Sequence, residues 1–161
     1  MAEREHGAPP QIRPSGLADY LDVMSKSVFQ SGISWAVVEK KWPGTREAFD
    51  GFDAIKVGDY KPEDIERLVQ DSRIIRNRRK VEGVVHNART IVALDREHRG
   101  FQKYLRSQPD YDSLAVDMRK RFKFLGDIGI YHFLWVVSEP VPEYEEWRRS
   151  HGVREMPPGK R

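Results

Sequence analysis

The 161-residue chain contains no cysteine. It can therefore form no disulfide framework, offer no thiolate nucleophile and build no zinc site that uses cysteine. Long apolar stretches are also missing, since none approaches the ~18 residues needed to cross a bilayer. The first sixteen residues carry charges and prolines where a signal peptide would have an apolar segment. We expect a soluble, cytoplasmic protein with no metal, no other cofactor and no membrane partner.

Positive and negative residues are nearly balanced in number. The 28 lysines and arginines outnumber the 25 aspartates and glutamates, which leaves a net charge of +3. Charged residues make up 33% of the chain and hydrophobic residues 39%, so a modest core lies under a strongly ionised surface. Proline, glycine and charge dominate both ends. This composition predicts a single domain over 17–149, with a flexible tail at 1–16 and a basic flexible tail at 150–161.

No sustained alternation of period two, the pattern of a half-buried strand, appears anywhere. Apolar residues recur instead every three or four positions, first from Leu17 to Val28 and most clearly from Val81 to Val92. The sequence therefore predicts an all-α fold. After a first helix from about Leu17, we expect helices near 33–42, 45–50, 54–58, 62–70, 77–95, 101–106, 113–121, 127–137 and 142–149.

Helix ends are predicted from proline and from capping side chains. Pro43 and the glycine after it predict a break between the second and third of these helices. Side-chain oxygens that can cap three later helices belong to Asp53, Asn77 and either Asp112 or Ser113.

A basic segment with two glycines, from Arg119 to Gly129, is followed by the apolar run from Ile130 to Val137. Four cations lie within five residues, at Arg119, Lys120, Arg121 and Lys123. The pattern predicts a helix, a tight hairpin containing Gly126 and Gly129, and a second helix whose first N–H groups can bind a phosphate. The alternative is an ordinary helix cap at Asp127 with solvated charges. The cations of 73–80 also allow two interpretations, phosphate contact or a solvated helix end.

A glycine turn precedes a large aromatic residue in Ser31-Gly32-Ile33-Ser34-Trp35. Such a turn can enter a DNA duplex, and a tryptophan beside it can stack on an extruded base. The alternative is that Trp35 belongs to the core. The five histidines include no pair at the i, i+4 spacing of a helical zinc site, and His132 is expected to pack in the core of its apolar helix.

These segments together resemble the DNA-3-methyladenine glycosylase I family of the helix-hairpin-helix superfamily. The segment 31–35 is similar to that family's A-G-L-S-W, and Phe122-Lys123-Phe124-Leu125-Gly126 is similar to its F-K-F-V-G hairpin. The resemblance covers about 17–137. Further matching segments are Lys40-Lys41, Phe49, Phe52-Asp53, 63–71, 74–80 and Asn87-Ala88-Arg89.

The resemblance implies base excision repair, in which the enzyme bends double-stranded DNA, extrudes an alkylated purine and hydrolyses its N-glycosidic bond. Trp35 would stack on the extruded base, and Gly32 and Ile33 would lie near the gap left in the duplex. The hairpin would bind phosphate, through Lys123, Gly126, Asp127 and Gly129. We expect the protein to act as a monomer.

The sequence departs from the family at the base-recognising glutamate, eight residues before the tryptophan, where it has Ser27. The family's Cys/His zinc site is not expected either, because cysteine is absent. Candidate replacement carboxylates are Glu39, Glu143 and Glu145. These departures leave two alternatives to a glycosylase: a helix-hairpin-helix protein that binds damaged or bent duplex with weakened or no catalysis, and an unrelated helical interaction module.

Overall fold

The computed structural model describes residues 10–152, which form helices and connecting loops and contain no strand. The all-α prediction is therefore confirmed. No helix within this described range is long and apolar enough to span a membrane. The helices are α1 (Leu17–Gln30), α2 (Trp35–Ala48), η2 (Asp50–Phe52), α3 (Ala54–Gly58), α4 (Pro62–Val69), α5 (Arg78–His98), α6 (Phe101–Leu105), α7 (Tyr111–Arg121), α8 (Asp127–Val136) and α9 (Tyr144–Ser150).

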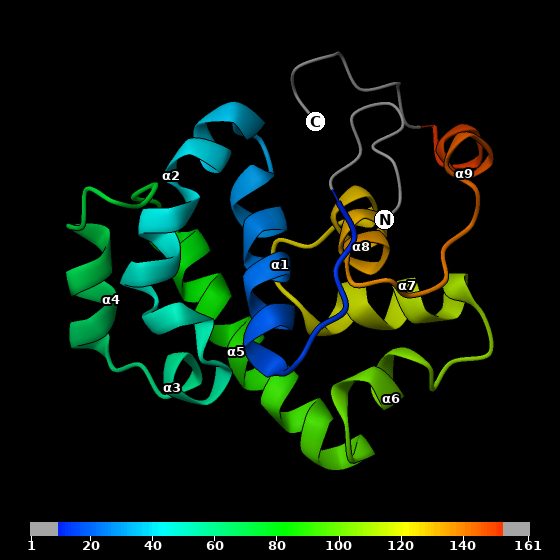
Figure 1. Ribbon diagram of the computed structural model, residues 1–161, viewed down its shortest axis with the longest axis horizontal. Helices are drawn as coiled ribbons and strands as arrows, with labels where there is room; N and C mark the ends of the chain where they lie inside the picture. The colour runs from blue at the N-terminus through cyan, green and yellow to red at the C-terminus, as the bar shows by residue number, and fades with distance from the viewer. Residues whose placement is uncertain (1–9, 153–161) are drawn as a thin grey trace.

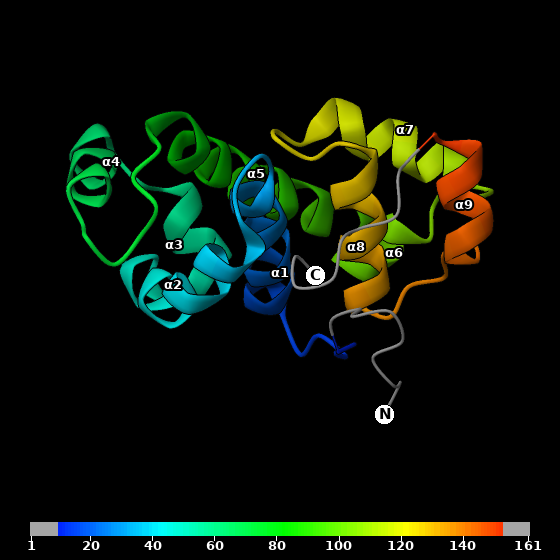
Figure 2. The same ribbon diagram turned by 90° about the horizontal axis from the view of Figure 1, so that it is seen from above.

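The long helix α5 organises the fold. It packs against α1, α3, α4 and α6, while α8 packs against α1 and α7. Figures 1 and 2 show α1 and α5 in the middle, with α2, α3 and α4 on one side and α6 to α9 on the other. Val84, Ala88 and Ile91 of α5 are completely buried, as the three-and-four spacing predicts. The two halves of the molecule therefore meet along α1 and α5.

Two of the three predicted caps are confirmed. The carboxylate of Asp53 accepts a hydrogen bond from the backbone N–H of Lys56 at 3.1 Å, and Asn77 accepts one from Lys80 at 3.2 Å. The cap expected at Asp112 or Ser113 is wrong. Helix α7 begins earlier, because extended Asp110 places its carboxylate 2.8 Å from the backbone nitrogen of Ser113.

The break predicted at Pro43 is also wrong, since α2 continues through it to Ala48. A proline inside a helix costs ~3 kcal/mol, so tertiary contacts must offset that cost. The indole N–H of Trp42 donates to Asp22 of α1 at 2.9 Å, and the Arg46 guanidinium pairs with the same carboxylate at 2.6 Å. These bonds hold α2 against α1 on both sides of the proline.

Part of the expected N-terminal tail contacts the end of α8. The backbone N–H of Ile12 donates to the carbonyl of Val136 at 2.7 Å, and the Ser138 hydroxyl donates to the carbonyl of Ile12 at 2.7 Å. Residues 1–9 and 153–161, which the tail predictions also include, lie outside the described residues.

Candidate functional site

A buried lysine of α5, Lys80, holds the turn between α1 and α2 in place. Gly32 has a φ of +74°, with no atom within 4 Å of the position a Cβ would take, so glycine serves the backbone conformation there. The Lys80 ammonium of α5 donates to the carbonyl of Phe29 at 3.4 Å and to that of Ser31. Burial lowers the pKa of Lys80. The lysine thereby satisfies carbonyls at the end of α1 that have no partner within the helix.

The hairpin loop between α7 and α8 is held by three residues of α5 spaced four apart. Asn87 donates to the carbonyl of Lys123 at 3.1 Å and accepts from its N–H at 2.8 Å. A Cβ on Gly83 would lie 2.8 Å from the Phe124 ring, so glycine allows that ring to rest on the helix. Arg79 lies over the same ring at 5.7 Å. The backbone of Lys123 is thus fixed while its side chain remains exposed.

Helix α8 begins beside α1. Gly126 is its N-cap and no side chain caps it in the described structure, so the cap expected at Asp127 does not form. Asp127 is the first helical residue and pairs with Arg119 of α7. A Cβ on Gly129 would lie 3.1 Å from Leu125 and 3.8 Å from the Ser27 Cβ. Glycine therefore allows the Leu125 side chain of the hairpin loop to pack closely on α8, and Ser27 of α1 lies at ordinary contact distance from the same position.

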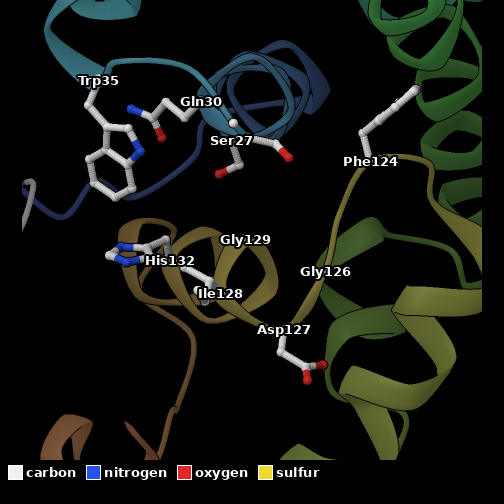
Figure 3. Close-up of a pocket in the computed structure, with 11 residues that line it drawn as sticks. Ser27, Gln30, Trp35, Phe124, Gly126, Asp127, Ile128, Gly129 and His132 are labelled. Carbon is white, nitrogen blue, oxygen red and sulfur yellow. The ribbon is translucent and has the colours of Figure 1, made fainter. Parts of the chain in front are cut away.

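A cavity of about 510 Å³ lies between the α1–α2 turn and the hairpin. It brings together Ser27, Trp35 and residues from both glycine-bearing segments (Figure 3). Its lining consists of Ser27, Gln30, Ser31, Gly32, Trp35, Phe124, Gly126, Asp127, Ile128, Gly129 and His132. Ile33 lies outside this lining and packs, partly buried, against the core. Lys123 is adjacent to the lining in sequence.

Trp35 is half-buried and borders the cavity, which contradicts the alternative of a core position. His132 of α8 packs edge-to-face with it, with ring centroids 5.2 Å apart and planes at 83°. The expectation that His132 belongs to the core is wrong, because its ring extends from α8 into the cavity beneath the indole (Figure 3). Burial lowers the pKa of His132 to about 4, so the imidazole is neutral near pH 7.

Sequence reasoning missed several lining residues besides His132. Gln30 stands one turn of α1 beyond Ser27, and both side chains face the cavity in Figure 3. Their i, i+3 spacing was a usable signal. His132 follows Gly129 by three residues and shares its face of α8, but the apolar residues around this helix do not indicate which face borders a cavity. Phe124 and Ile128 complete the apolar part of the lining.

Carboxylates are scarce at the cavity. Its lining contains one, Asp127, which is paired with Arg119 and points away from the other labelled side chains in Figure 3. The three candidate replacements for the family glutamate lie elsewhere: Glu39 pairs with Lys26 at 2.6 Å, Glu143 caps α9 and Glu145 pairs with Arg148 at 2.7 Å. No described cluster of three or more histidines and acids could hold a metal.

Most cations of 73–80 already have partners. Arg73 pairs with Asp71 at 2.7 Å, Arg78 pairs with Glu66, and Lys80 is buried. Arg79 lies over the Phe124 ring. This favours a structural role for the cluster over phosphate contact.

Comparison with known proteins gives a consistent result. Residues 18–118 match a family described as methyladenine glycosylase. The DNA-3-methyladenine glycosylase 1 of Escherichia coli (strain K12) is 34% identical over 126 residues, which cover 65% of this chain and 67% of the relative. The DNA-3-methyladenine glycosylase of Haemophilus influenzae is also 34% identical over 126 residues, covering 65% of this chain and 68% of that protein.

Solved structures agree. A crystal structure of 3-methyladenine DNA glycosylase I has a TM-score of 0.66 at 27% identity, covering 78% of this chain and 81% of the other. A solution structure of 3-methyladenine DNA glycosylase I has a TM-score of 0.64 at 29% identity, covering 83% and 81%. The Staphylococcus aureus enzyme, at 22% identity and a TM-score of 0.70 over 87% and 92% of the chains, shows the fold alone.

Proposed function

Because the chain belongs to the methyladenine glycosylase family, we propose that it is a DNA glycosylase of base excision repair that extrudes an altered base from double-stranded DNA and hydrolyses its N-glycosidic bond. The observation that carries this proposal is the cavity between the α1–α2 turn and the hairpin, with Trp35 at its edge. Its volume of about 510 Å³ is typical of small-molecule sites. We further propose that the protein acts as a monomer.

The hairpin supplies the DNA contact in this proposal. Of its four cations, Arg119 pairs with Asp127 and Arg121 pairs with Asp117 at 2.7 Å. Lys120 and Lys123 form no ion pair within the described residues, so they remain to attract phosphate. The uncapped start of α8 adds backbone N–H groups and the positive end of a helix dipole beside them.

The turn and the indole act on the base. Gly32 and Ile33 would lie at the gap that the extruded nucleotide leaves, and Trp35 would stack on the base, an interaction that contributes ~1–3 kcal/mol. Enclosure between α1 and α8 removes water from the base. Catalysis would then depend on stabilising the departing base and the developing positive charge on the sugar more strongly than the intact nucleotide.

One observation favours a second candidate function. The only carboxylate among the lining residues is paired with Arg119, so none is free to stabilise positive charge on the sugar. The second candidate is therefore a protein that extrudes and binds an altered base with weakened or no hydrolysis.

Base release separates the two candidates. Purified protein is incubated with duplex DNA that carries either cationic methylated purines or uncharged altered bases, and released bases and lesion binding are measured together. A glycosylase releases base, and Trp35→Ala lowers the release at least tenfold while Trp135→Ala, which removes a half-buried indole outside the cavity lining, does not. Tight lesion binding without release supports the second candidate. Equal affinity for damaged and intact duplex contradicts both.

A further inference from the structure

The charged groups around the cavity influence whether it binds a cationic or an uncharged base. Its single carboxylate, Asp127, is paired with Arg119. The Lys80 ammonium lies on the other side of the turn, bonded to the carbonyl of Ser31, which is itself a lining residue. A cationic base would meet no free anion among the described lining residues and a fixed positive charge nearby. Since an unpaired charge is costly to bury, this arrangement disfavours a cation.

The hydrogen-bonding groups of the cavity are neutral. Ser27 and Gln30 face it from α1, and His132 faces it from α8 (Figure 3). Within residues 10–152, no hydrogen bond links these three side chains to another residue. A neutral imidazole offers one N–H donor and one acceptor nitrogen, which match the acceptor and donor on the edge of an uncharged base.

The position of His132 is set by its packing. Its ring is held edge-to-face against Trp35 at 5.2 Å and lies 6.2 Å from the ring of Tyr131. The imidazole therefore lies beside the indole, in the same cavity that a base stacked on Trp35 would enter. Trp35 offers its face to any base, so selection depends on the groups that meet the edge.

We propose that the cavity selects altered bases that carry no formal charge, and that His132 recognises their edge by hydrogen bonding. The inference rests on the glycosylase function proposed above and specifies its substrate class. It differs from a recognition scheme based on a carboxylate, which favours positively charged bases.

The test uses two lesions of the same shape in one duplex sequence. In DNA, 3-methyladenine is cationic, whereas its 3-deaza analogue carries the same methyl group without the charge. Binding to each labelled duplex and to the undamaged duplex is measured by fluorescence anisotropy. We expect wild-type protein to bind the uncharged lesion most tightly.

His132 variants test the recognising group. His132→Leu should weaken binding to the uncharged lesion by roughly two- to tenfold, as expected for one neutral hydrogen bond. His132→Gln, whose amide can replace one ring nitrogen, should retain most of it. Binding of undamaged duplex should not change. The control is His98→Leu, which removes an imidazole packed on Tyr104 outside the cavity lining.

A second measurement avoids any folding defect in the variants. The ring nitrogens of His132 in wild-type protein are followed by NMR while the duplex carrying the uncharged lesion is added. A shift of either nitrogen that intact duplex does not produce supports the proposal.

Tighter binding of the cationic lesion overturns the inference. So does an unchanged affinity in His132→Leu together with unshifted ring nitrogens. In either case the preference for a lesion over intact duplex would remain, and the proposed function with it. If neither lesion is preferred over intact duplex, the glycosylase proposal fails as well.

Discussion

The hairpin loop between α7 and α8 and the cavity side chains Ser27 and His132 (the base-facing side of the cavity) differ in how many bonds fix them to the rest of the protein. Asn87 binds the loop backbone at Lys123 through two hydrogen bonds, and the Phe124 ring rests on Gly83. The side chains of Ser27 and His132, by contrast, form no hydrogen bond to other described residues. Exchanging a side chain that forms no hydrogen bond leaves no partner in the fold unsatisfied. The proposed DNA contact is thus held by the fold itself, whereas the proposed base selection depends on a few side chains that form no hydrogen bonds within it.

Ser27→Glu should produce the largest change on the base-facing side. A carboxylate at this position adds a charge-assisted hydrogen bond worth ~1.5–3 kcal/mol, so release of cationic 3-methyladenine should rise by about one to two orders of magnitude. Ser27→Gln has the same shape without the charge and is the matched control. Base release from methylated DNA is the measurement. Robust release by wild-type protein that Ser27→Glu leaves unchanged would mean that the required carboxylate comes from elsewhere.

Low pH should reduce the free energy of unfolding, because His132 is protonated less readily in the folded protein than in the unfolded chain. Its pKa is about 4 in the folded protein and about 6.5 when unfolded, so the unfolded chain binds more protons between these values. The stabilisation is complete above pH 6.5 and is lost as the pH falls towards 4, by at most about 3 kcal/mol. In urea unfolding, wild-type protein should therefore lose stability relative to His132→Gln as the pH falls from 6.5 towards 4. A difference between them that is constant from pH 4.5 to 7.5 contradicts this assignment.

Gly83→Leu should displace the hairpin loop from α5 and destabilise the protein. The new side chain would overlap the Phe124 ring, and overpacking of this kind costs about 1–3 kcal/mol. We expect a lower free energy of unfolding in urea together with weaker binding of any duplex. Gly126→Ala is the control for stability, because no atom lies within 4 Å of the position that its Cβ would take and its φ is −88°. Unchanged DNA affinity in a folded Gly83→Leu protein would separate the loop from DNA binding.

Lys123→Ala should have the smallest effect. Loss of one phosphate contact should reduce the slope of log affinity against log salt concentration by about one, with little dependence on sequence or damage. Lys103→Ala removes an exposed lysine of α6 and is the control. Equal slopes for the two variants would show that Lys123 does not contact phosphate.

The sequence predicts the helices well because their apolar spacing is strong, and it predicts Trp35 and Ser27 as neighbours of one site through the family resemblance. It does not predict His132 in the cavity, because α8 is apolar around most of its surface and its periodicity identifies no exposed side. The continuation of α2 through Pro43 depends on bonds from Trp42 and Arg46 to Asp22, a residue of another helix. Local rules contain no information about such contacts.

The buried ammonium of Lys80 also gives the α1–α2 turn a chemical reporter. An amine-modifying reagent can reach it only when the turn separates from α5, because the side chain is buried beneath Phe29 and Ser31. Under native conditions its rate of modification therefore measures how often this segment opens, provided that the segment opens more often than the whole protein unfolds. If insertion into DNA requires the turn to move, the lysine should become reactive at the same frequency at which the protein can admit a base.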